Sequence, residues 1–222
     1  MRRFSSAALL LALAACVRAP IAPPAAPVPG PPADGVAGSV LAPPTDAPMA
    51  SESADLAYLR ERQLIVPVAG AAPSAIEDSF NEPRDGGRTH RAIDILAPRG
   101  TPILAADDGR ILRLSTNSLG GITIYAVDPA GRIVYYYAHL DHYHPGLSAG
   151  MTLAKGDTLG YVGTTGNAPK DTPHLHFQIM RMPQDGKYWY GDPIDPYTLL
   201  LAAARAAAAH AAAAGGGGRD QR

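Results

Sequence analysis

The central part of this chain consists of short apolar runs rich in Ile, Val, Tyr and Thr, which are residues typical of β-strands. Turn signals such as 98–100 (Pro-Arg-Gly) and 128–131 (Asp-Pro-Ala-Gly) separate the runs, and they follow one another too closely for helical crossovers. The pattern therefore predicts a mainly β domain of antiparallel hairpins. The expected strands are residues 64–68, 101–105, 109–114, 122–127, 133–138, 158–162 and 174–179.

Helical patterns occur on either side of this region. Leu56, Leu59 and Leu64 fit one face of a short amphipathic helix over residues 51–64, which we expect to pack against the domain. Residues 197–214 are alanine-rich and have high helix propensity. We therefore expect the β domain to be flanked by short helices.

The first sixteen residues have the features of a lipoprotein signal peptide. An Arg2-Arg3 pair precedes an apolar run, and residues 13–16 (Leu-Ala-Ala-Cys) resemble the lipobox of bacterial lipoproteins, in which the Cys is acylated. The alternative is an ordinary signal peptide with a chance cysteine. We expect a membrane anchor at lipidated Cys16, and Val17 after it is typical of sorting to the periplasmic face of an outer membrane, where the cell has one.

Composition divides the chain into five parts. Residues 1–15 are the expected signal peptide, and residues 16–50 are a Pro/Ala-rich flexible linker whose prolines favour extended conformations. Residues 51–80 hold the leading helix and a connection. We assign residues 81–198 to the folded domain, and residues 199–222 to an Ala-rich helix with a Gly-rich disordered tail.

The charge balance excludes some classes of partner. The formal net charge is -1 and the pI is near 6.6. A large basic surface is therefore not expected, and we expect no nucleic-acid partner and no electrostatic binding to a membrane. The single cysteine, Cys16, also excludes an internal disulfide.

Candidate chemistry begins with His174 and His176. Residues two apart on a strand project to one face, so both imidazoles would reach one groove while Leu175 and Phe177 face the core. Two exposed histidines on a solvated strand would give the same pattern. Asp94, between Ile93 and Ile95, needs a partner if it is buried, because an unpaired buried charge is strongly unfavourable.

Three explanations for Asp94 remain open at this point. The carboxylate is exposed on a sheet edge, paired with Arg88 or Arg91, or bound to a metal. Two imidazoles and one carboxylate would leave a fourth zinc position vacant, as in catalytic rather than structural sites. Such a set points toward hydrolysis.

Further histidines differ in their settings. His90 lies four residues before Asp94, although it also reads as a lone loop histidine. His139 lies at the end of an aromatic strand and is expected on the same face as Tyr135 and Tyr137. It is a candidate site residue, and the alternative is a packed, hydrogen-bonded histidine without a role in chemistry. Residues 142 and 144 are histidines that we expect in a surface loop.

Six collinear motifs between residues 81 and 179 together resemble the lysostaphin-type or LytM-type peptidoglycan metalloendopeptidases. Each motif alone is weakly specific, but six in order with compatible spacing are not expected by chance. They are residues 86–94 (Gly-Gly-Arg-x-His-x-x-x-Asp), 100–102 (Gly-Thr-Pro), 106–109 (Ala-Asp-Asp-Gly), 136–140 (Tyr-Tyr-Ala-His-Leu), 156–160 (Gly-Asp-x-x-Gly) and 173–177 (Pro-His-Leu-His-Phe).

The resemblance implies a small antiparallel β domain of the duplicated hybrid motif type, with a narrow substrate groove. It makes His90, Asp94 and His176 the ligands of a Zn²⁺ cofactor, with His139 and His174 as the catalytic residues beside the vacant position. One departure is Ala92, where the family usually has Gly. The extra methyl group removes no ligand.

The activity implied by this resemblance is zinc-dependent hydrolysis of peptide cross-links in bacterial peptidoglycan during cell-wall remodelling. For a bacterium with an outer membrane, the expected bond joins D-Ala to meso-diaminopimelate, whereas Gly-Gly cleavage needs another wall chemistry. His174 would be the general base and His139 the donor to the oxyanion, or these roles would be exchanged. Peptidoglycan peptide stems are the expected substrate, and regulatory envelope proteins are further candidate partners.

Two readings compete with an enzyme. One is a non-catalytic LytM-like wall-binding module that activates a separate amidase, and the intact ligand set weighs against it. The other is a structural lipoprotein that tethers the membrane to the wall, which would need neither zinc nor a vacant coordination position. The linker alone is compatible with both.

Overall fold

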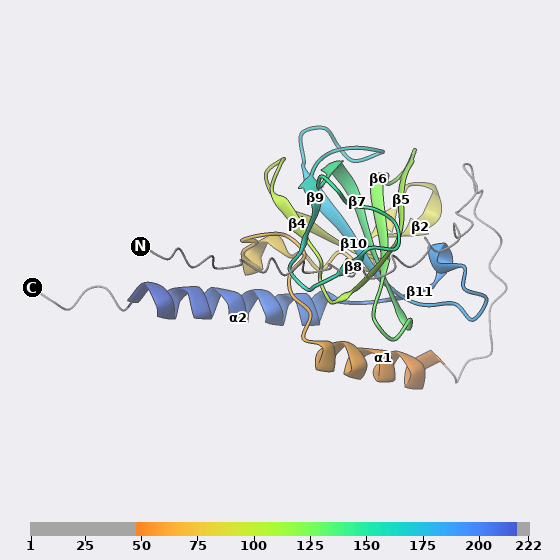
Figure 1. Ribbon diagram of the computed structural model, residues 1–222, viewed down its shortest axis with the longest axis horizontal. Helices are drawn as coiled ribbons and strands as arrows, with labels where there is room; N and C mark the ends of the chain where they lie inside the picture. Colours follow the sequence, from red (N-terminus) through yellow and green to blue (C-terminus); the bar gives the residue numbers. More distant parts are fainter. Residues whose placement is uncertain (1–47, 217–222) are drawn as a thin grey trace, which may run out of the picture.

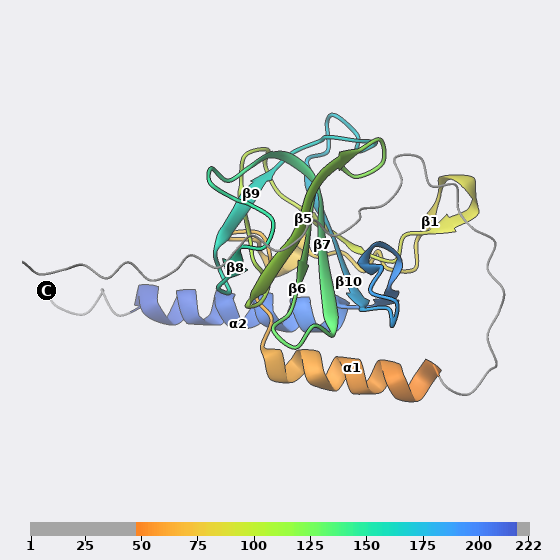
Figure 2. The ribbon, with the colours of Figure 1, turned by 45° about the vertical axis from the view of Figure 1, so that its right-hand side comes forward.

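The computed structural model describes residues 48–216, and this part of the chain is mainly antiparallel β with one α-helix at each end (Figure 1). Helix α1 spans Pro48–Arg62 and helix α2 spans Tyr197–Gly216. Both lie on the same side of the β-strands in two views (Figures 1 and 2). The predicted fold class and both flanking helices are confirmed.

The main sheet has the strand order β11-β10-β7-β6-β5-β8. Outside this path, β3 pairs with β10, β9 pairs with β7, and β4 pairs with β9. All of its strand pairs are antiparallel, as the short connections predicted. A separate two-stranded hairpin, β1 and β2, precedes it. The strands are β1 Pro83–Arg84, β2 Arg88–Thr89, β3 Ile93–Leu96, β4 Pro102–Leu104, β5 Gly109–Asn117, β6 Gly121–Val127, β7 Ile133–Tyr143, β8 Thr152–Leu153, β9 Thr158–Val162, β10 His174–Arg181 and β11 Asp192–Ile194.

The prediction of a strand at residues 64–68 is wrong. This segment makes only an isolated bridge between Val68 and Ile103, together with single backbone bonds such as Ile65 N–H to the Ala106 carbonyl. Pro67 has no N–H and cannot take part in a continuous ladder as a donor, which explains why pairing stays local. The segment still covers the β4 edge, because the Pro67 carbonyl accepts from Leu104 N–H.

The apolar faces of the strands meet in one core. Leu175 and Phe177 are fully buried, as the alternation along β10 predicted, and Ile95 of β3 is buried beside them. Leu59 of α1 and Leu200 of α2 are also fully buried in this core. The helices are therefore integral parts of the domain.

Helix α1 also docks through polar side chains. Arg62 makes two hydrogen bonds to Asp107, of 2.7 and 2.9 Å, and the Asp107 side chain is completely buried. Tyr58 donates to Asp128, and Asp55 accepts from Arg181 at 2.7 Å. The side of α1 that faces the domain therefore carries these polar residues beside Leu59, and it is more polar than the apolar face expected from the sequence.

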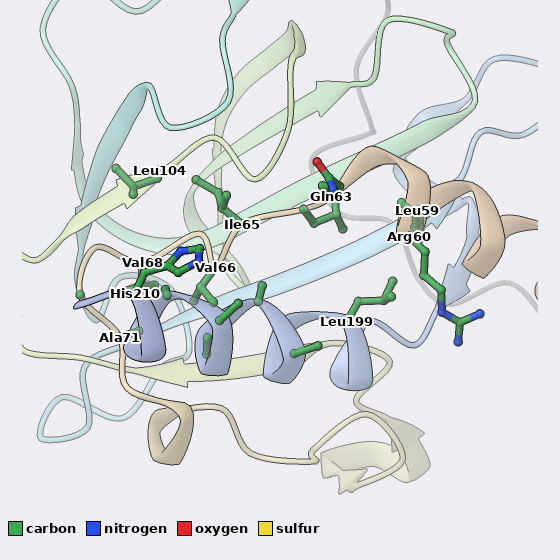
Figure 3. A pocket seen from close by; sticks show the side chains of 17 residues that line it. Leu59, Arg60, Gln63, Ile65, Val66, Val68, Ala71, Leu104, Leu199 and His210 are labelled. Carbon is green, nitrogen blue, oxygen red and sulfur yellow. The ribbon is translucent and has the colours of Figure 1, made fainter. Parts of the chain in front are cut away.

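A groove runs between α2 and the segment that follows α1, and Figure 3 shows Val66, Ala71, Leu199 and His210 around it. Its lining is almost entirely aliphatic. Beyond Ala204, α2 is exposed up to Ala214 and extends past the strands (Figure 1). This groove lacks the histidine and carboxylate pairs that characterise the site described below.

Several expectations fall outside residues 48–216. They are the signal peptide at 1–15, lipidated Cys16, nearly all of the linker at 16–50 and the end of the Gly-rich tail. Within the described residues, neither α1 nor α2 has the length and apolar character needed to cross a membrane.

Candidate metal centre

The pairing of β3 with β10 brings the first two candidate ligands together. His176 stands directly opposite Asp94 in this antiparallel register, while His174 stands opposite Leu96. His90 approaches from the turn before β3, where its backbone N–H is bonded to the Glu82 carbonyl. Two distant parts of the sequence, residues 90–94 and β10, therefore converge at one end of the β3–β10 pair.

Three ligand atoms form a compact triangle. His90 Nε2 lies 3.0 Å from Asp94 Oδ1 and 2.9 Å from His176 Nδ1, and Asp94 Oδ1 lies 3.2 Å from His176 Nδ1. Tetrahedral zinc with bonds of about 2.0 to 2.1 Å places its ligand atoms about 3.3 Å apart. The triangle is only slightly smaller than this, so the residues fit a zinc ion.

Ser79 fixes both His90 and Asp94. Its carbonyl lies 2.9 Å from His90 Nδ1, so Nδ1 donates the proton and Nε2 is left as the ligand nitrogen. The Ser79 hydroxyl accepts from the Asp94 backbone N–H at 3.1 Å. Sequence reasoning missed Ser79, because no pattern distinguishes a serine in this role.

His139 and His174 flank the triangle, with ring centroids 5.0 Å apart. His174 Nδ1 donates to the Thr172 carbonyl at 2.8 Å, and His139 Nδ1 donates to the Thr165 carbonyl at 2.9 Å. In the neutral form of each ring Nε2 is thus the unprotonated nitrogen. His174 Nε2 lies 3.9 Å from Asp94 Oδ1.

A β-bulge directs His139 into the groove. Tyr135 and Tyr137 face the core, so the parity we inferred for His139 would bury it there. Two residues of β7, Ala138 and His139, oppose a single position of β6, and His139 has a φ of 63°. The extra residue reverses the alternation, which is how bulges re-aim side chains beside active sites.

All five candidate residues line one groove of about 570 Å³. This volume is within the range of about 300 to 1,000 Å³ that is usual for ligand sites. Tyr136 and Trp189 add aromatic surface to it. His142 and His144 are exposed as expected, although His142 belongs to β7 and stacks on Tyr161 instead of lying in a loop.

The protonation states suit metal ligands. Burial alone would raise the pKa of Asp94, but the close imidazoles of His176 and His90 hold the pKa of that carboxyl well below its usual range. Burial lowers the pKa of His139 to about 4 and also lowers the pKa of His176. At pH 7 the Asp94 carboxylate is ionised and the His176 imidazole is neutral, as metal binding requires of ligands, and the flanking His139 is neutral too.

The arginine paired with Asp94 is Arg84, which lies 2.7 Å from Asp94 Oδ2. Sequence reasoning had pointed to Arg88 and Arg91 as the arginine alternatives. Ala92, where the resemblance favours Gly, is fully buried, so the fold accommodates its methyl group. Asp94 thus combines an arginine contact with contacts to the candidate ligand histidines.

Residues 88–196 match the model described as peptidase family M23. The L-Ala--D-Glu endopeptidase of Bacillus subtilis (strain 168) is 30% identical over 114 residues, covering 49% of this chain and 34% of that protein. Peptidoglycan DD-endopeptidase ShyC of Vibrio cholerae is 33% identical over 93 residues, covering 42% of this chain and 20% of ShyC.

A third relative is named as an uncharacterized lipoprotein, YgeR of Escherichia coli (strain K12). It is 33% identical over 95 residues, covering 43% of this chain and 35% of that protein. The chain therefore spans about a third or less of the length of these relatives. Because the region matched by the family model contains all five candidate residues in order, we conclude that residues 88–196 of this chain are a peptidase family M23 domain.

Proposed function

We propose that this protein is a zinc-dependent endopeptidase that hydrolyses peptide cross-links of bacterial peptidoglycan. The observation that carries the proposal is the triangle of His90, Asp94 and His176, whose dimensions suit zinc, with two further histidines facing it. The match to peptidase family M23 supports the same activity, as do the names of two relatives, an L-Ala--D-Glu endopeptidase and a peptidoglycan DD-endopeptidase.

The proton chemistry follows from the hydrogen bonds of the two flanking histidines. A zinc ion held here would lower the pKa of its water from about 15.7 to about 7 and would polarise the scissile carbonyl. His174 accepts the proton of the attacking water at Nε2, because its Nδ1 is committed to the Thr172 carbonyl.

His139 has a conditional role. Its Nδ1 proton is used by the Thr165 carbonyl, so Nε2 donates a hydrogen bond only when the ring is protonated. Burial lowers the pKa of His139 to about 4, which keeps the resting ring neutral at pH 7. We therefore assign oxyanion stabilisation to His139 once it holds the proton that the attacking water gave to His174, whose ring centroid lies 5.0 Å away, and this proton then passes to the leaving amine.

The groove suits an extended peptide, and we propose the D-Ala to meso-diaminopimelate cross-link as its substrate. The naming of one relative as a DD-endopeptidase supports this choice, whereas the name of another specifies an L-Ala--D-Glu bond. Cleavage of purified cross-linked dimers, followed by mass spectrometry, distinguishes these bonds because each releases fragments of different mass.

The experiment that tests the activity uses the purified full chain and isolated peptidoglycan. We expect release of un-cross-linked stem peptides, loss of this release after chelation of zinc, and recovery when zinc is restored. Protein that holds stoichiometric zinc but releases no fragments would contradict catalysis. Stimulation of a separate amidase by that protein would then favour the binding-module alternative.

We further propose that Cys16 carries the lipid anchor and places the domain in the cell envelope, on the periplasmic face of the outer membrane. The lipobox-like sequence supports this location, as does similarity to a protein named as a lipoprotein. Cells fed labelled palmitate should incorporate label into this protein, and Cys16→Ser should abolish incorporation. Label in the Cys16→Ser variant equal to wild type would overturn the anchor.

A further inference from the structure

The two oxygens of the Asp94 carboxylate face different partners. Oδ1 lies 3.0 Å from His90 Nε2 and 3.2 Å from His176 Nδ1, at the triangle of candidate ligand atoms. Oδ2 lies 2.7 Å from Arg84 Nη2. A carboxylate that is free to rotate could offer both oxygens to one cation, and here one oxygen is already bonded elsewhere.

Arg84 reaches Asp94 from a separate structural unit. It belongs to the β1–β2 hairpin, which pairs Pro83 with Thr89 and turns through Asp85–Gly87. The hairpin is tied to the site on its other strand too, because His90 follows β2 directly. The position of the guanidinium is therefore set by the same short segment that supplies a ligand.

The contact is a single charge-assisted bond. Arg84 Nη2 also lies 3.4 Å from Glu82 Oε2, while Arg84 Nε is buried without a hydrogen-bond partner. Hydrogen bonds between ionised groups are shorter and about twice as strong as neutral ones. Such a bond is strong enough to fix the rotation of the Asp94 carboxylate.

We propose that Arg84 is a positioning residue that restricts Asp94 to a single coordinating oxygen and so keeps the fourth position of the zinc site available. The inference rests on the proposed zinc site. Removal of Arg84 frees Oδ2 to join Oδ1 on the metal, which raises the coordination number and crowds the position needed by water. It also removes a positive charge near the dication, so metal binding is not weakened.

The test compares Arg84→Met, Arg84→Lys and wild type in the full chain, loaded with zinc or cobalt(II). We expect Arg84→Met to retain stoichiometric metal, with an altered cobalt absorption spectrum that indicates a higher coordination number. Its kcat on peptidoglycan should fall about 10- to 100-fold, the usual effect of removing a partner of a metal ligand. Arg84→Lys should partly restore both properties, because one ammonium can replace a single bond.

A matched control is Arg99→Met. Arg99 Nε donates to Asp141 at 2.7 Å on an exposed surface, so this variant removes an arginine–carboxylate pair that is not part of the ligand triangle. It should leave the cobalt spectrum and kcat unchanged.

Three results would overturn the proposal: an Arg84→Met spectrum identical to wild type, a folded Arg84→Met protein that no longer holds metal, or an Arg84→Lys spectrum no closer to wild type. The spectrum is measured without substrate. A protein without endopeptidase activity would therefore still reveal whether Arg84 controls coordination.

Discussion

His176→Ala should lose bound zinc and lower peptidoglycan hydrolysis at least about 10³-fold. His176 Nδ1 is one corner of the ligand triangle, 2.9 Å from His90 Nε2 and 3.2 Å from Asp94 Oδ1. The remaining two side chains are too few for a stable site, and the several kcal/mol of transition-state stabilisation supplied by the metal disappear with it. Metal content by mass spectrometry and the rate of fragment release measure the two effects.

The control for this variant is His144→Ala. His144 is exposed, and its backbone makes the hydrogen bonds: its N–H donates to the Leu159 carbonyl, and its carbonyl accepts from the Leu147 N–H. This variant should keep both zinc and activity, which excludes a general effect of losing an imidazole. Stoichiometric zinc in folded His176→Ala would remove His176 from the ligand set.

His174→Ala and His139→Ala should retain zinc, and kcat should fall about 10²- to 10⁴-fold in each, the usual contribution of a positioned acid or base. Both side chains are held by backbone carbonyls and lie beside the triangle without forming its corners. Metal content, kcat and KM measured on a defined cross-linked peptide test this separation. A folded variant that loses its zinc would identify that histidine as a ligand.

The pH profile adds a second readout for these variants. Because the pKa of His139 is lowered, its neutral form persists as the pH falls below the ordinary histidine value of about 6.5, until about pH 4. Protonation of His139 should therefore not limit wild-type activity between pH 6 and 7. An acidic decline in that interval that disappears in His139→Ala would contradict the lowered pKa.

Local sequence patterns correctly predicted much of the fold and part of the candidate site. The two-residue period of β10 predicted that His174 and His176 share a face opposite Leu175 and Phe177, and the structure has this arrangement. The polar Asp94 in an apolar strand correctly indicated a residue with partners. These inferences need only neighbouring residues, and therefore one sequence suffices.

Other features depend on long-range pairing or on the backbone. Thr165 and Thr172 act through carbonyl groups, which every residue has, so their side chains give no signal. The choice of Arg84 as partner of Asp94 depends on the shape of the β1–β2 hairpin. The bulge that turns His139 to the groove arises from register between β6 and β7, which alternation along one strand cannot predict.

The metal roles and domain boundaries inferred from sequence stay predictions. The structure brings His90, Asp94 and His176 together and sets His139 and His174 beside them, whereas the experiments above test what each does. The family match begins at residue 88 and ends at residue 196, inside the range of 81–198 assigned to the folded domain.

The register of β10 against β3 determines both the packing of the apolar core and the position of the candidate metal ligands. A slip of one residue would place Leu175 or Phe177 opposite Asp94 and turn His174 and His176 into the core, since side chains alternate strictly along a strand. A mutation that favours such a one-residue slip should therefore lower the free energy of unfolding and dismantle the histidine cluster together.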